Sequence, residues 1–162
     1  MANRKAVNER TYSYKQLRTV AELSKKEADN WVRSGVIKSE LPFGRRRRVY
    51  TFESLMEGWI AKQLADFSSR ELLPKMMKGF RSCLKDHKID INEVAPDPSI
   101  PRLMIQIYTR ISHELMPGGG IRGVIVYAKR FEPRPEISKG IYLIVDLNQI
   151  AIDVYYAIGQ FD

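Results

Sequence analysis

Hydrophobic residues recur at helical spacing through the first half of the chain. They lie three and four positions apart with polar residues between them, as on one face of a helix that packs against a core. The strongest pattern begins at Phe52, directly after Thr51, a residue that is suited to cap a helix. The pattern predicts helices over residues 14–23, 24–35, 51–67 and 70–87.

The second predicted helix carries both a start signal and a stop signal. Ser24 and Glu27 match a capping box, and Gly35 is suited to the left-handed position that follows a last turn. Two short helices joined this closely form a helix-turn-helix candidate. The residues expected to face the core are Ala28, Trp31 and Val32, and those expected to face solvent are Lys25, Lys26, Asp29, Asn30 and Arg33.

A basic segment follows this candidate. Residues 36–50 contain two short extended stretches around a turn at Pro42, and they end in Arg45, Arg46, Arg47 and Arg48 before Val49 and Tyr50. This order predicts a β-hairpin, or wing. Arginine binds phosphate well because its guanidinium group is always charged and presents a planar fork of donors. A solvated basic surface is the alternative interpretation of the same run.

The second half of the chain has a different pattern. An amphipathic helix is expected over residues 101–116, then strands over about 122–131 and 141–146. Residues 148–158 fit a strand and a helix, and the helix is slightly favoured. The expected fold class is mainly α or α+β. Its parts are a flexible arm at 1–11, a winged helix-turn-helix domain at 12–88, a linker at 89–100, and a small α+β domain with a short sheet at 101–162.

The excess of positive charge lies entirely in the first half of the chain. Residues 1–88 hold 20 Lys and Arg against 10 Asp and Glu, whereas residues 89–162 hold 7 against 9. Such asymmetry indicates one half that binds a polyanion and a second half with another role. The predicted DNA contacts are Arg18, Lys25, Lys26, Asn30, Arg33, Arg45, Arg46, Arg47, Arg48 and Tyr50.

The order of helix, capped helix, glycine, proline-containing wing and long helix resembles the DNA-binding domain of the MerR-like superfamily. Leu17 and Ser24 fall at the family's spacing, Gly35-Val36-Ile37 is similar to its Gly-Leu-Leu, and Arg48-Val49-Tyr50 is similar to its Arg-x-Tyr. The similarity spans about residues 12–87, and the C-terminal half resembles no family. It implies a winged helix-turn-helix whose second helix enters the major groove. Asp29-Asn30-Trp31 replaces the usual Arg-Tyr-Tyr, and Glu22 stands where a turn glycine is common.

The sequence gives little support for a metal, cofactor or catalytic site. Cys83, His87 and His113 are too few for a disulfide framework or a cysteine-rich zinc site, and we expect no metal and no cofactor. Gly118–Gly120 lacks the lysine of a phosphate-binding loop. Because the acidic residues near the C-terminus are scattered, we expect no enzyme, although a pocket lined by Arg122, Asp146 and Asp153 would favour one. No stretch is long and apolar enough to span a membrane, so we expect a cytoplasmic, nucleoid-associated protein.

The sequence therefore predicts a transcriptional regulator that binds double-stranded DNA sequence-specifically as a homodimer, because one small winged domain reads few bases. The alternative is an antitoxin-type or excisionase-like DNA-binding module whose C-terminal half binds a protein partner.

Overall fold

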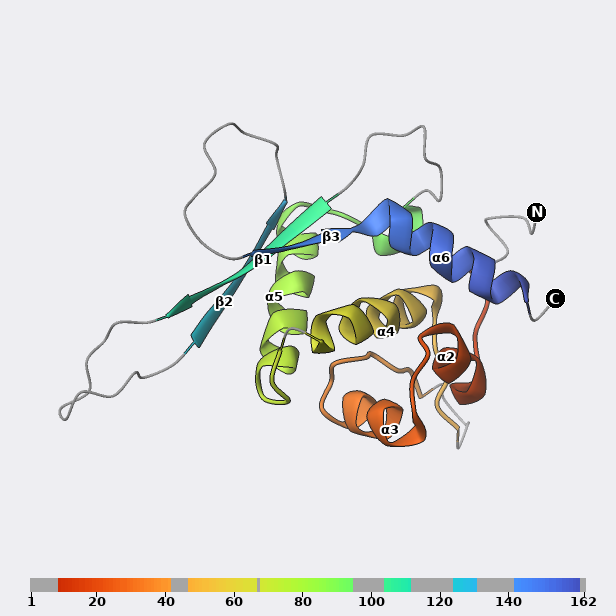
Figure 1. Cartoon of the computed structure of the whole chain (residues 1–162). Coiled ribbons are helices and arrows are strands. Elements are labelled where there is room, and N and C mark those ends of the chain that lie inside the picture. Colours follow the sequence, from red (N-terminus) through yellow and green to blue (C-terminus); the bar gives the residue numbers. More distant parts are fainter. Residues whose placement is uncertain are drawn as a thin grey trace.

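The computed structural model describes residues 9–41, 47–66, 68–94, 104–111, 124–130 and 142–160. This part of the chain is mainly helical, as the hydrophobic pattern predicts (Figure 1). Its elements are α2 (Tyr14–Val20), α3 (Lys25–Arg33), α4 (Phe52–Ala65), α5 (Leu72–Asp86), the short 3-10 helix η1 (Ile91–Glu93), β1 (Met104–Ile111), β2 (Val124–Arg130), β3 (Tyr142–Asp146) and α6 (Leu147–Gly159).

The predicted helix starts at Ser24 and Thr51 are confirmed. Ser24 accepts a hydrogen bond from the Glu27 amide, and the Glu27 side chain in turn accepts one from the Ser24 amide. Thr51 caps α4 in the same way. These bonds satisfy amides that have no partner within the first turn of a helix. Gly35, just beyond α3, has a φ of +74°, the left-handed conformation expected of it.

Helix α4 lies at the centre of the described structure. It packs against α2, α5 and α6, and α6 also contacts α2 (Figure 1). The ring of Phe52 on α4 meets that of Tyr155 on α6 with their centroids 5.1 Å apart. One cluster of buried hydrophobic residues contains side chains from α2, α3, α4, α5 and α6. Part of the predicted linker contributes to it, because Ile91 and Val94 are buried.

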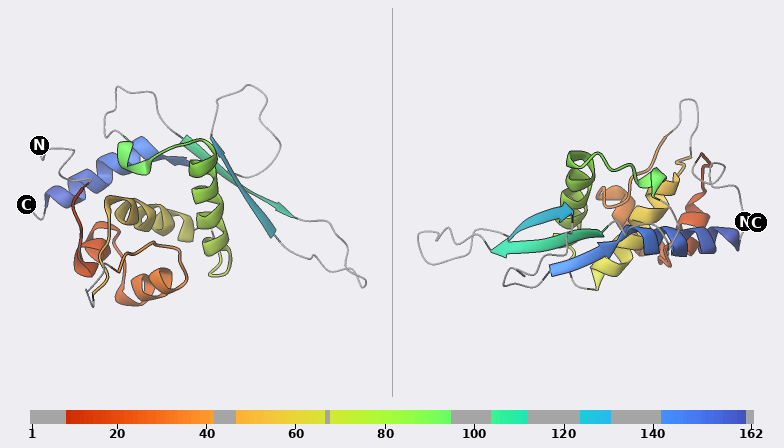
Figure 2. Two further views of the ribbon diagram at one scale, coloured as in Figure 1. Left: turned by 180° about the vertical axis from the view of Figure 1, so that it is seen from behind. Right: turned by 90° about the horizontal axis from the view of Figure 1, so that it is seen from above.

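Three antiparallel strands form a sheet in the order β2-β1-β3, so that the middle strand is the first in sequence. Helix α5 lies against β1 and β2 (Figure 2). The prediction of a helix over residues 101–116 is wrong for Met104–Ile111, which form strand β1. The strands β2 and β3 lie within the ranges predicted for them, and residues 148–158 belong to α6, the interpretation that was slightly favoured.

The predicted wing is only partly described. Glu40 and Val49 form a single antiparallel bridge, as do Tyr12 and Tyr50, and no longer strand pairing occurs in the described part of residues 36–50. Pro42, Phe43, Gly44, Arg45 and Arg46 lie outside the described residues. Within the ranges that the structure covers, no helix combines the length and the apolar character needed to cross a membrane.

Candidate nucleic-acid interface

The exposed face of α3 has nearly the composition that the sequence predicts. Lys25, Lys26, Asp29 and Arg33 are exposed, and Asn30 is partly exposed. Ala28 is buried, but Trp31 and Val32, which were expected inside the core, are only half-buried. Helix α3 therefore lies shallowly on the surface, with polar and basic side chains directed to solvent.

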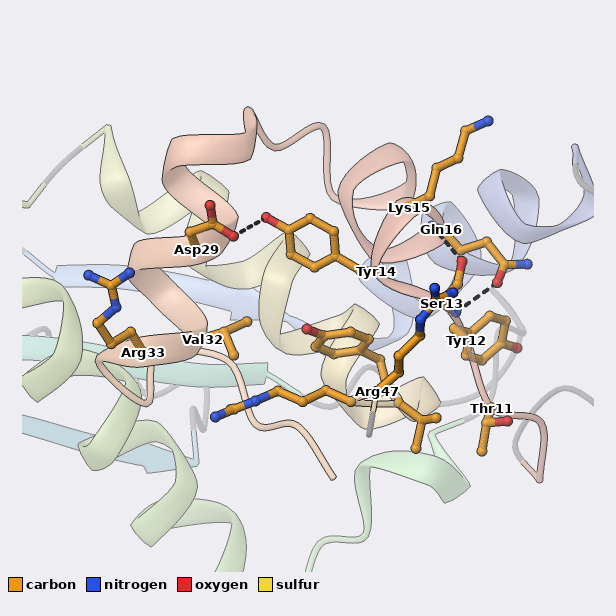
Figure 3. A pocket seen from close by; sticks show the side chains of 13 residues that line it. Thr11, Tyr12, Ser13, Tyr14, Lys15, Gln16, Asp29, Val32, Arg33 and Arg47 are labelled. Carbon is orange, nitrogen blue, oxygen red and sulfur yellow. Dashed lines mark hydrogen bonds between the residues drawn. The ribbon is translucent and has the colours of Figure 1, made fainter. Parts of the chain in front are cut away.

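An open groove of about 900 Å³ runs along one side of α3 (Figure 3). Its walls are residues 11–16 at the start of α2, one side of α3, and residues 47–50. Lys15, Arg33, Arg47 and Arg48 all line it, so three separate segments of the chain contribute cationic side chains to the groove. A concentration of positive charge on several walls of one groove suits a polyanionic ligand.

Tyr14 joins the two helices of the candidate motif across this groove. Its hydroxyl group donates a hydrogen bond to Asp29 Oδ1 at 2.5 Å and lies 3.2 Å from the backbone oxygen of Lys25 (Figure 3). Burial and the hydrogen bond with Asp29 raise the pKa of Tyr14 to about 12. The hydroxyl group therefore keeps its proton at neutral pH and remains a donor.

Helix α3 is also fixed to α4. Glu27 Oε1 pairs with Lys62 Nζ at 2.9 Å, while Glu27 Oε2 accepts the Ser24 amide at 2.8 Å. The hydrogen bonds with Ser24 and then with Lys62 lower the pKa of Glu27 to about 2. Glu27 thus remains ionised over the physiological range and holds the first turn of α3 against the centre of the fold.

A buried carboxylate supports the other end of α3. The side chain of Glu57 on α4 is 1% exposed and pairs with Arg81 on α5. Glu57 Oε2 also accepts the Lys38 amide at 2.8 Å, and Arg81 donates to the backbone oxygens of Gly35 and Val36. These bonds fix the segment that leaves α3 and leads toward the basic run.

Two arginines of the basic run are described, and both are exposed. Arg48 Nη1 donates to Ser39 Oγ at 2.8 Å, which orients its guanidinium group beside the groove. Arg47 lines the same groove. The predicted contacts Arg45 and Arg46 lie outside the described residues.

Two predicted contacts are placed differently from the expectation. Tyr50 is only 2% exposed, packs beside the ring of Tyr14 and still lines the groove, which favours a packed tyrosine over a surface phosphate contact. Arg18 is partly buried, and its Nε donates to the Leu23 backbone oxygen at 3.2 Å. This bond closes the turn between α2 and α3, so Arg18 contributes to the structure of the turn.

A second groove, of about 610 Å³, lies on the opposite side of α3 and was not predicted. Lys26, Trp31 and Arg33 line it from α3, and residues 68–70 line it from the turn before α5. Within the described ranges, Ser68 Oγ is the one buried side-chain oxygen or nitrogen without a hydrogen-bond partner. The signal that could have indicated this groove is the polar Ser68-Ser69-Arg70 run between two apolar helices.

The groups weighed for catalysis have structural roles where they are described. Asp146 caps α6 by accepting the Gln149 amide at 3.1 Å, and Asp153 accepts Gln149 Nε2 at 3.0 Å. Burial raises the pKa of the Cys83 thiol. Over the residues that the structure covers, no three His, Cys, Asp or Glu side chains gather as they would around a metal ion. Arg122 and Gly118–Gly120 lie outside the described residues.

The case for this interface comes from the residues of the chain itself. The groove on each side of α3 is lined by cationic side chains, and α3 is capped, exposed and fixed at both ends. No protein-family model and no curated protein matches the chain.

Proposed function

We propose that this protein is a transcriptional regulator that binds double-stranded DNA sequence-specifically, with α3 in the major groove and the Arg45–Arg48 segment on the phosphate backbone. One observation carries the proposal: Arg33 of α3, Arg47, Arg48 and Lys15 surround a single groove beside an exposed, capped helix. Phosphate contacts position a protein on DNA, while side chains on an inserted helix read the base edges.

The second groove supports the same arrangement. A helix in the major groove lies between two phosphate backbones, and α3 has cationic side chains on both sides. Arg47 and Arg48 would face one backbone, and Lys26 and Arg70 would face the other. In this arrangement Asn30 and Arg33 are the candidates to contact base edges, since asparagine pairs well with adenine and arginine with guanine.

The arrangement corresponds to a MerR-like winged helix-turn-helix that acts as a homodimer. A dimer would read two half-sites about one helical turn of DNA, or a multiple of it, apart. The C-terminal strands and α6 would supply dimer or partner contacts in a cytoplasmic, nucleoid-associated protein.

The first experiment selects bound duplexes from a random pool and measures affinity for the selected site by fluorescence anisotropy. Enrichment of two related half-sites at a fixed spacing would support the proposal. If no sequence is enriched, sequence-specific binding is excluded.

The second experiment measures the salt dependence of that affinity. An Arg47→Ala, Arg48→Ala double variant should weaken binding to all sequences and lower the slope of log K against log salt by about 0.9 for each phosphate that the variant no longer neutralises. The matched control replaces Lys78 and Lys85, two exposed cations on α5, with alanine. Equal slopes for the two double variants would contradict a phosphate role for Arg47 and Arg48.

The third experiment repeats the selection with Asn30→Ala and with Arg33→Ala. Each variant should lose the preference for one base pair in the half-site while it continues to bind DNA. Unchanged preferences in both variants would show that α3 does not read the sequence.

A further inference from the structure

The groove beside α3 contains one acidic residue among its cations. Asp29 is exposed on α3 and lines the groove together with Lys15, Arg33, Arg47 and Arg48. A carboxylate at this place repels phosphate and so weakens general affinity for DNA. Its presence on the face that is proposed to contact DNA therefore calls for a more specific role.

Asp29 is held by a neutral donor and not by one of these cations. Its Oδ1 accepts the Tyr14 hydroxyl at 2.5 Å, and in the described part of the chain Asp29 forms no salt bridge. The ring of Tyr14 is itself fixed, with Tyr50 on one side and the Arg18 guanidinium carbon 5.9 Å from its centre. The second carboxylate oxygen of Asp29 points away from Tyr14 (Figure 3).

An ionised carboxylate accepts hydrogen bonds and cannot donate them. In the major groove, guanine presents two acceptors and thymine presents one acceptor, all of which repel a carboxylate. Adenine presents an amino donor, but beside it lies the N7 acceptor, which also repels a carboxylate. Cytosine presents its N4 amino group, a donor, and is the base with which aspartate pairs. The chemistry of Asp29 thus favours cytosine over the other three bases.

We propose that Asp29 is a specificity-determining residue that accepts a hydrogen bond from the N4 amino group of a cytosine, and that Tyr14 is the positioning residue that holds its carboxylate. This inference rests on the proposed function, because it requires α3 to lie in the major groove. It assigns a base to the position at which the chain departs from the basic residue of the similar family.

The test is a parallel selection of bound duplexes by the unaltered protein and by Asp29→Asn, Asp29→Ala and Tyr14→Phe. The unaltered protein should prefer cytosine about tenfold at one position of each half-site. Asp29→Asn should prefer adenine at that position, since an amide pairs with the adenine edge. Asp29→Ala should show no preference there, and Tyr14→Phe should reduce the preference for cytosine without a change in the salt slope.

The control is Asp86→Asn, which removes the same charge from an exposed position at the end of α5. It should leave every base preference unchanged. If Asp29→Asn binds the same sequences as the unaltered protein, only more tightly, Asp29 acts by simple repulsion and the inference is wrong while the proposed function stands. If no protein selects any sequence, the proposed function fails and the inference fails with it. Circular dichroism of each variant checks that α3 remains folded.

Discussion

Glu22 adopts a left-handed backbone conformation, with a φ of 52°, in the turn between α2 and α3. This conformation costs a residue with a side chain about 1–2 kcal/mol, whereas glycine adopts it freely and loses about 0.5–1 kcal/mol of backbone entropy on folding. Glu22→Gly should therefore raise the free energy of unfolding by about 0.5 kcal/mol, measured by urea denaturation.

The control for this change is Glu71→Gly, at an exposed position where φ is −83°. With no strain to relieve, this second substitution should not stabilise the protein. A decrease in stability for Glu22→Gly as large as that for Glu71→Gly would contradict the argument from strain.

The role of a single residue could be predicted where it depends on residues close to it in the sequence. The bonds of Ser24 with Glu27 and the conformation of Gly35 depend on neighbours a few positions away in the sequence. For Tyr50, residue type is compatible with both a phosphate contact and a packed ring, and a bridge with Tyr12, which is remote in sequence, decides for burial. The bond of Arg18 with the Leu23 backbone oxygen depends on the shape of a turn, which residue types alone do not determine.

At the scale of elements, the pair of Glu57 and Arg81 joins α4 and α5 to the end of α3. Removing one member of a buried ion pair leaves the other charge without compensation, at a cost of about 3–5 kcal/mol. Arg81→Met should therefore lower the free energy of unfolding by about 3 kcal/mol. Lys38→Met breaks an exposed pair with Glu53 and should cost less than about 1 kcal/mol. Similar costs in urea denaturation would contradict this distinction.

Glu27, at the start of α3, links stability to pH. Its pKa is lowered from 4.5 to about 2 by the hydrogen bonds with Ser24 and Lys62. The carboxylate therefore stabilises the folded state fully above pH 4.5, and this contribution is lost as the pH falls from 4.5 to about 2. Glu27→Gln should lower the urea midpoint at pH 6, and the difference from the unaltered protein should shrink toward pH 2.

The control for the pH series is Glu71→Gln, whose side chain makes no cap hydrogen bond. Its urea midpoint should follow that of the unaltered protein over the whole range. A constant difference between Glu27→Gln and the unaltered protein down to pH 2 would contradict the assigned pKa.

Strand β1 shows why some elements could not be predicted. The apolar residues of this segment fit a helix at Met104, Ile107, Tyr108 and Ile111, but residues 105, 107, 109 and 111 are also β-branched and alternate along a strand. Pairing with β2 and β3 on both sides decides between the two patterns. Those partners follow later in the chain, so local spacing contains no information about them.

At the scale of the molecule, α6 completes the core that α2 and α4 begin. Val154 and Ala151 are fully buried within the same cluster as Phe52 and Leu17. The sequence pattern predicts a linker at residues 89–100 and a separate C-terminal domain that contains α6. Prolines and a change in charge suggest such a boundary, but they contain no information about which earlier helix the later one covers.

This shared core predicts that α6 unfolds together with the N-terminal helices. Val154→Ala removes buried methyl groups and should lower the free energy of unfolding by about 2 kcal/mol. The chain has two tryptophans, Trp31 on α3 and Trp59 on α4, so their fluorescence reports on the N-terminal helices alone. The urea midpoint by fluorescence should fall as far as the midpoint by circular dichroism, whereas Tyr156→Ala, at a position 76% exposed, should change neither. A fluorescence midpoint that stays in place while the dichroism shows an earlier transition would mean that α6 belongs to a unit that folds separately.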